Sequence, residues 1–375
     1  MEKWKAALYR ALLWPLPRMC DGKKELSLPR ETAQTGEAIL RILRAHHAVG
    51  ACVAVFDRDG ITATVSYGDA VLGSMPVTEH TVFRAASISK HITAMAAFRL
   101  AEEGTIDLDA DVDTYLPCSL RHPDAPDTPV TLRRLLSHTA GIHDGKFYVD
   151  ACTQNPPLNE VMQDDSFAAV PDAFEYSNLG AGIAACVLEG MLQKDFESIM
   201  QDALFAPLGI TATFYPQNAS GDIANAFRVL PPAKAPALDN AVRRARPKPS
   251  GMPDPAHHYL LAQGNLYISA PELARLGMEL ATARYAPMRT PIAPFGRRAD
   301  NLTEGLGTFI VNDPSVCPQT VYGHQGLAYG AMHGLFYDPA TGRGFALLTS
   351  GASEARVGVL SDINKALIKK VLSHD

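Results

Sequence analysis

Hydrophobic and polar positions follow two different periods near the start of this chain. In residues 31–46 apolar side chains recur every three or four positions, which predicts an amphipathic helix. Residues 51–56 and 61–67 are instead β-rich runs on either side of a turn sequence, residues 57–60, that ends in glycine. This change of period predicts a helix followed by a β-hairpin, and hence the first part of a sheet.

A second group of β-rich segments lies close to the C-terminal end. Its members are residues 307–311, 320–322, 331–337 and 344–349. Residues 354–372 then carry apolar side chains every three or four positions, which predicts a helix able to cover one face of a sheet. The two ends of the sequence therefore predict one sheet assembled from distant segments.

Between these halves the pattern is mostly helical. Helical periods occur in residues 132–137, 180–192 and 196–204. The predicted organisation is an N-terminal extension (residues 1–30), a discontinuous sheet domain (residues 31–105 and 256–375) and an inserted helical domain (residues 106–255). The predicted fold class is therefore α/β in the broad sense, of the α+β kind.

Two proline-rich stretches, residues 117–129 and 231–255, interrupt the inserted part. Proline disfavours the interior of helices and strands, because it fixes its own backbone angle and lacks an N–H donor. Both stretches are therefore predicted to be long surface loops, and the second is expected to shape entry to a cleft.

Composition excludes some classes of partner. Of 375 residues, 47% are hydrophobic and 20% charged, enough to bury a sizeable core. Lys and Arg total 34 against 40 Asp and Glu, and this net charge of −6 offers no global positive field for nucleic acid or anionic lipid. The six cysteines form no Cys-x-x-Cys pair, and neither zinc-site histidine spacing nor a nucleotide-binding loop occurs. No metal or other cofactor is predicted.

The first twenty residues are the one candidate for a targeting segment. Arg10 interrupts their apolar stretch and no small-residue cleavage site follows, so we expect a short amphipathic helix and a cytoplasmic protein. An atypical secretion signal in residues 1–20 is the alternative, which would place the protein outside the cytoplasm. The most apolar internal stretch, residues 179–188, is half of the roughly 20 residues that cross a bilayer, so no stable membrane span is predicted.

The sharpest chemical pattern is a Ser-x-x-Lys motif formed by Ser87 and Lys90. Ser87 opens a predicted helix that runs to Glu102, and a spacing of three places the Lys90 ammonium one turn from the serine hydroxyl. Lys90 could then take the serine proton, while the backbone N–H of Ser87 faces a developing oxyanion at the positive end of the helix. The alternative is a helix-capping serine beside a solvated lysine.

Two further motifs follow in order along the chain. Tyr176 and Asn178 form a Tyr-x-Asn element, and His324 and Gly326 form a His-x-Gly element. With Ser-x-x-Lys, this ordered set resembles that of the penicillin-recognising serine hydrolases, which include β-lactamases, penicillin-binding proteins and related esterases. The Tyr-Ser-Asn form looks like the class C β-lactamase branch with its esterase and D-aminopeptidase relatives.

The resemblance reaches beyond the three motifs. Residues 130–142 and 205–210 are similar to other recurring segments of the family, and the similarity covers most of the chain from about residue 35. It implies a β-lactamase/transpeptidase-like fold, in which an antiparallel sheet is flanked by N- and C-terminal helices and carries an inserted, mainly helical domain.

By this resemblance Ser87 is the acylated nucleophile and Lys90 its partner. Tyr176 would be the general acid/base, and Asn178 would position substrate or hold Lys90 by hydrogen bonding. A tyrosine, with an ordinary pKa of about 10, acts as a base near neutral pH only if a cation stabilises its phenolate, and Lys90 is the available cation. The expected mechanism therefore couples Tyr176 to Lys90.

The same resemblance places His324 and Gly326 on the strand that forms one wall of the site. The backbone N–H of Leu327 would join that of Ser87 in the oxyanion hole. His324 stands where β-lactamases and cell-wall transpeptidases usually have the lysine of Lys-Thr-Gly, and histidine is mostly neutral at pH 7. This departure disfavours a penicillin substrate and favours an ester, an amide or a small peptide.

The motifs together predict a serine hydrolase that forms an acyl-enzyme at Ser87 and acts on a small-molecule ester, amide or D-amino-acid peptide. The first alternative is a class C-like β-lactamase or D-Ala-D-Ala carboxypeptidase, in which Arg343 or Arg356 would replace the missing lysine. The second alternative is a non-hydrolytic penicillin-binding or sensor protein on the same fold. The oligomeric state stays open.

Overall fold

The structure is a computed structural model of the chain, and it describes most of the sequence. The described residues are 1–13, 24–27, 33–146, 156–162, 164–167, 171–229, 237–238, 257–296 and 301–373. The predicted loop at residues 231–255 lies outside them except for residues 237–238, as does the end of the predicted helix in residues 1–20.

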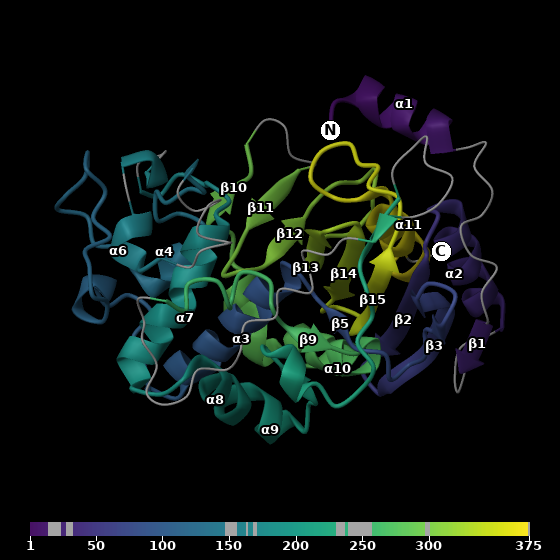
Figure 1. Cartoon of the computed structure of the whole chain (residues 1–375), viewed down its shortest axis with the longest axis horizontal. Coiled ribbons are helices and arrows are strands. Elements are labelled where there is room, and N and C mark those ends of the chain that lie inside the picture. Colours follow the sequence, from purple (N-terminus) through teal and green to yellow (C-terminus); the bar gives the residue numbers. More distant parts are fainter. Residues whose placement is uncertain are drawn as a thin grey trace.

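One antiparallel sheet of ten strands forms the centre of the molecule (Figure 1). The strand order is β1-β3-β2-β15-β14-β13-β12-β11-β10, and β4 pairs with β3. The strands are β1 (Lys24–Ser27), β2 (Gly50–Asp57), β3 (Gly60–Val71), β4 (Met75–Pro76), β10 (Ala293–Pro294), β11 (Leu302–Glu304), β12 (Phe309–Val311), β13 (Val321–Ala328), β14 (Ala331–Asp338) and β15 (Arg343–Gly351).

The pairing of β2 with β15 joins the two halves of the sequence. Val53 on β2 faces Leu347 on β15 across an antiparallel ladder. The predicted sheet of distant segments is therefore confirmed. The described residues also form two small sheets. In one, β9 (Tyr267–Ile268) pairs with β5 (Phe83–Arg84) and β6 (Ala212–Thr213), and in the other β7 (Phe227–Arg228) pairs with β8 (Ala237–Leu238).

Helices cover both faces of the large sheet, because alternate side chains of its central strands are apolar on both sides. Val53 and Val55 of β2 belong to a core with α2 (Ala33–Ala45) and α11 (Asp362–Val371). Cys52 and Phe56 point to the opposite core, shared with α3 (Ile88–Glu102) and α10 (Ala270–Ala281). Helix α10 was not predicted from the sequence, although Ser269 marks its start by accepting a hydrogen bond from the backbone N–H of Glu272.

The C-terminal helix begins later than predicted. It starts at Asp362 with Ser361 as its N-cap, so residues 354–361 of the predicted helix are not helical. Gly358 in this segment has a φ of +76°, a left-handed angle that glycine adopts without strain and that ends helical periodicity. The segment is instead an irregular connection from β15 that reaches the site described below.

The part between the sheet halves is mainly helical, as predicted, and lies beside the sheet around α7 (Figure 1). Its helices are α4 (Leu132–Leu136), α6 (Leu158–Val161), α7 (Asn178–Leu192), α8 (Phe196–Met200), the π-helical turn η3 (Gln201–Phe205) and α9 (Ala206–Leu208). Short 3-10 turns are η1 (Val112–Thr114), η2 (Asp164–Ser166), η4 (Pro216–Asn218) and, after α10, η6 (Ala283–Arg289). Ile183 and Val187 of α7 share the core that contains α3, so both parts meet at the start of α3.

The N-terminal residues form α1 (Lys3–Leu13), which confirms the predicted short helix over its described part. Ala6 and Leu13 are buried, the Tyr9 hydroxyl donates to the backbone carbonyl of Val229, and Arg10 pairs with Asp362 at 2.6 Å. In the part of the chain that the structure describes, no helix combines the length and apolarity that crossing a bilayer requires.

Candidate active site

Ser87 directly precedes α3, and its side chain does not cap the helix. Its backbone has helical angles of φ −64° and ψ −8°. Ala86 before it has a φ of +49°, an angle that non-glycine residues rarely adopt and that costs energy. The alternative of a helix-capping serine is therefore wrong, and a strained backbone presents Ser87 Oγ to the cavity.

Lys90 lies one turn later and is buried, so the alternative of a solvated lysine is also wrong. Its Nζ atom is 3.1 Å from Ser87 Oγ, 2.8 Å from Asn178 Oδ1 and 2.5 Å from the backbone oxygen of Gln263. Burial lowers the pKa of Lys90 to about 7, while the charge of Asp144 raises it. A neutral amine beside the Ser87 hydroxyl is thus accessible at neutral pH.

Asp144 holds the residues behind Lys90 and was not predicted from the sequence. Its carboxylate accepts hydrogen bonds from Ser177 Oγ at 3.1 Å, Asn178 Nδ2 at 2.7 Å and the Leu179 backbone N–H at 2.9 Å. Because the amide nitrogen of Asn178 donates to Asp144, its amide oxygen is left to face Lys90. The one sequence signal for Asp144 is its position directly after the recurring segment at residues 130–142.

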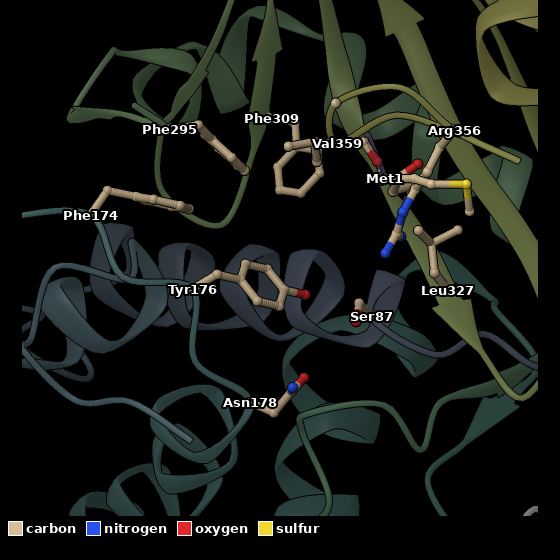
Figure 2. Close-up of a pocket in the computed structure, with 12 residues that line it drawn as sticks. Met1, Ser87, Phe174, Tyr176, Asn178, Phe295, Phe309, Leu327, Arg356 and Val359 are labelled. Carbon is tan, nitrogen blue, oxygen red and sulfur yellow. Dashed lines mark hydrogen bonds between the residues drawn. The ribbon is translucent and has the colours of Figure 1, made fainter. Parts of the chain in front are cut away.

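Tyr176 lies beside Ser87, and its hydroxyl points toward it (Figure 2). The centre of its ring is 5.3 Å from Lys90 Nζ and 4.4 Å from the ring of His138. Burial raises the pKa of Tyr176 well above its ordinary value, although a hydrogen bond with the Ser87 side chain opposes this. The site therefore favours a protonated phenol, whereas the sequence analysis expected a phenolate stabilised by Lys90.

Strand β13 brings Gly326 and Leu327 to the same place. A Cβ atom on Gly326 would lie 2.3 Å from the backbone oxygen of Ala85, so only glycine lets β13 approach the segment that leads to Ser87. Leu327 lines the cavity, and its side chain lies close to Ser87 in Figure 2. The role of Gly326 is therefore steric, because it allows β13 to pack against the segment before Ser87.

His324 is placed differently from the expected substrate contact. Its side chain is buried behind the cavity, where its ring centre is 4.0 Å from that of Phe309 and 6.3 Å from that of His91. Burial lowers the pKa of His324 well below its ordinary value. Neither His324 nor Gly326 is among the described residues that line the cavity. The neutral His324 ring instead packs behind Phe309, which does line it.

The cavity above Ser87 has a volume of about 460 Å³. Its lining residues are Met1, Ser87, Phe174, Tyr176, Asn178, Phe295, Phe309, Gln325, Leu327, Arg356, Gly358 and Val359. Figure 2 shows aromatic rings on one side of Ser87 and the Arg356 guanidinium on the other. The rings of Phe174 and Phe295 are 4.1 Å apart at their centres and form an apolar wall that the sequence analysis did not identify.

Gln325 ties β13 to the irregular segment that carries Arg356. Its amide nitrogen donates to the backbone oxygen of Val359 at 2.6 Å, and its amide oxygen accepts from the backbone N–H of Ser361 at 3.0 Å. Gln325 stands where Lys-Thr-Gly has threonine, and here it holds in place the segment that connects β15 to α11. In the described ranges no cluster of three His, Cys, Asp or Glu side chains is arranged to hold a metal ion.

Comparison with known families agrees with this geometry. The family described as Beta-lactamase matches residues 33–369. The chain belongs to the Beta-lactamase family. The predicted resemblance to the penicillin-recognising serine hydrolases is thereby confirmed.

Curated relatives of this Beta-lactamase family chain differ in length. "Penicillin-binding protein 4" of Amycolatopsis lactamdurans is 29% identical over 343 residues, which cover 86% of this chain and 86% of that protein. "Protein flp" of Staphylococcus aureus (strain MRSA252) is 25% identical over 185 residues, or 47% of this chain. The match to Protein flp spans 36% of that protein, so the chain matches only about a third of its length.

Solved structures share the fold of this Beta-lactamase family chain. EstCE1, described as a hydrolase with promiscuous acyltransferase activity, has a TM-score of 0.72 at 21% identity, covering 90% of this chain and 97% of its own. The D-amino acid amidase of Ochrobactrum anthropi SV3 has a TM-score of 0.67 at 21% identity, covering 91% and 98%. The predicted fold class is confirmed by these likenesses together with the antiparallel sheet.

Proposed function

We propose that the protein is a serine hydrolase that forms an acyl-enzyme at Ser87. The observation that carries this proposal is the 3.1 Å contact between Lys90 Nζ and Ser87 Oγ, made by a lysine whose pKa burial lowers to about 7. An amine with that pKa is substantially unprotonated at neutral pH, so it can accept the serine proton. The descriptions of the fold neighbours as a hydrolase and an amidase support the same reaction class.

In the proposed reaction Lys90 accepts the Ser87 proton while Oγ attacks the substrate carbonyl and forms a tetrahedral intermediate. The backbone N–H groups of Ser87 and Leu327 stabilise the oxyanion. Tyr176 then donates its proton to the leaving oxygen or nitrogen as the scissile bond breaks, and the Lys90 ammonium returns a proton to Tyr176. Water then attacks the acyl carbonyl while Lys90 accepts its proton, and as the bond between the acyl carbon and Ser87 Oγ breaks, the Lys90 ammonium returns that proton to Oγ and the acid product leaves.

The cavity favours a substrate that carries both an apolar part and a negative charge. Its aromatic wall suits the apolar part, whereas Arg356 is the one charged side chain among the described lining residues. No acidic side chain of the described part of the chain pairs with Arg356, so its guanidinium is free to bind a carboxylate. Arg343 begins β15, at the far end of that strand from the segment with Arg356.

Within that class we propose small esters, amides or D-amino-acid peptides as substrates. The support is the description of one fold neighbour as a D-amino acid amidase and the name EstCE1 of another. Arg356 takes the place of the cation that His324 cannot supply, because burial keeps the His324 ring neutral.

Intact-mass analysis of the whole protein tests the acyl-enzyme. We expect a fluorophosphonate to add one label to the wild type and to Ser74→Ala, an exposed-serine control, but none to Ser87→Ala. The same variant should lose turnover of a p-nitrophenyl ester. Labelling or turnover that persists in Ser87→Ala would disprove the proposed nucleophile.

A class C-like β-lactamase or a D-Ala-D-Ala carboxypeptidase is the second candidate. It is favoured by the 29% identity to Penicillin-binding protein 4 over most of both chains and by the free Arg356. Nitrocefin turnover would select the β-lactamase, and release of D-Ala from a peptide ending in D-Ala-D-Ala would select the carboxypeptidase. Acylation across ester and β-lactam substrates without any turnover would instead select a penicillin-binding sensor.

A further inference from the structure

Helix α1 has two apolar faces, and the body of the protein covers one of them. The inner face, with Ala6 and Leu13, packs on the body, where Arg10 pairs with Asp362. A helix whose only role was to cover the core would have a polar, solvent-facing outer side. The outer face of α1 is instead apolar.

The outer face consists of Met1, Trp4, Leu8 and Leu12. Their exposed fractions are 42%, 62%, 52% and 42%. The last three are spaced by four residues, which places them in one row along the helix. Among the described residues six large hydrophobic side chains are exposed, and four of them belong to this outer face. Such a concentration of apolar surface marks an interaction site.

Charge decides which partner this face fits. Arg10 is neutralised by Asp362 on the inner face, so Lys3 and Lys5 against Glu2 leave α1 a net charge of +1 (2 − 1), although the whole chain carries −6. The pair of Lys5 with Glu2 is exposed on both sides and therefore weak. Two copies of α1 would bring two positive helices together, whereas an anionic surface would attract this helix and repel the rest of the molecule.

We propose that the outer face of α1 binds the surface of a bilayer that contains anionic lipids. The helix lies in the plane of the interface, with Trp4, Leu8 and Leu12 among the headgroups and acyl boundary and the lysines near the phosphates. Because Met1 lines the cavity above Ser87, this docking brings the cavity to the membrane surface. The binding does not depend on the proposed hydrolase activity.

Tryptophan fluorescence gives a specific test, because the two tryptophans of the chain are Trp4 and Trp14, both in this N-terminal segment. The full chain is titrated with phosphatidylcholine vesicles, with and without one quarter phosphatidylglycerol, and bound protein is measured by sedimentation. We expect a blue shift and co-sedimentation with the anionic vesicles, both weakening as salt is raised.

Three double variants keep both tryptophans. Leu8→Ser with Leu12→Ser should weaken vesicle binding by about 10-fold or more, and Lys3→Glu with Lys5→Glu should abolish the preference for anionic vesicles. Leu72→Ser with Ile292→Ser removes exposed apolar side chains elsewhere and should bind like the wild type. The proposal is overturned if wild-type protein does not bind the anionic vesicles, or if the leucine variant binds them equally well. It is also overturned if light scattering shows self-association that this variant abolishes, without vesicle binding.

Discussion

Replacing Asp144 with asparagine separates the charge of Asp144 from its shape. Asp144 Oδ2 and Lys90 Nζ lie on either side of the Asn178 amide, through contacts of 2.7 Å and 2.8 Å. The two charges are therefore roughly 7 Å apart, and at an effective dielectric of about 20 to 40 their attraction is on the order of 1 to 2 kcal/mol. Losing it should lower the pKa of Lys90 further below its value of about 7, because the charge of Asp144 raises it.

The assay is kcat/KM for a p-nitrophenyl ester between pH 5 and pH 9. Since the free amine of Lys90 is the proposed base, wild-type activity should rise as pH increases through about 7. In Asp144→Asn, kcat/KM should rise at a pH roughly one unit lower than in the wild type. Its plateau should be about 10-fold lower, because the Asn178 amide loses its fixed orientation. Asp127→Asn, an exposed control, should match the wild type. An unchanged midpoint, or a shift to higher pH, would refute the electrostatic role and leave Asp144 a structural residue.

Three further predictions concern packing, specificity and pH. Gly326→Ala should destabilise the protein by about 1–3 kcal/mol in urea unfolding and slow acylation, because its Cβ would meet Ala85; full stability would contradict the close approach of β13. Arg356→Gln should lower the preference for an ester that carries a free carboxylate, over the same ester with a neutral carboxamide in its place, by about 10-fold in kcat/KM, whereas Arg343→Gln should not. A preference that persists in Arg356→Gln would exclude contact between Arg356 and the substrate carboxylate. Burial lowers the pKa of His91 to about 4. Protons therefore bind the unfolded state first, and stability should fall as pH drops from about 6.5 toward 4, by up to about 3 kcal/mol for this residue. His91→Asn should flatten that slope in urea unfolding, and an unchanged slope would count against it.

Local periodicity predicted the elements well where each element is regular. The hairpin at residues 51–67 appears as β2 and β3, because alternating side chains and a glycine turn specify a hairpin without distant contacts. The same reasoning failed at residues 354–361, where apolar spacing suggested a helix but Gly358 has a left-handed φ and the helix begins only after its N-cap, Ser361. That error concealed the segment that carries Arg356 into the cavity.

The candidate side chains Ser87, Lys90 and Tyr176 could be singled out from motif order and family resemblance, because the chemistry open to a hydroxyl, an amine or a phenol is a property of the side chain. Their protonation states could not. Burial and the distant carboxylate of Asp144 set the pKa of Lys90, and burial keeps Tyr176 protonated. Desolvation depends on which atoms surround a group, and those atoms come from remote parts of the chain.

By itself the sequence determined the central strands of the sheet, most helices and the side chains proposed to react. Only the tertiary structure decided that His324 is buried and neutral, that Arg356 is the charged side chain of the cavity, and that α1 lies beside its mouth. The physical reason is that periodicity is local, whereas burial, charge environment and cavity shape arise when segments hundreds of residues apart pack together.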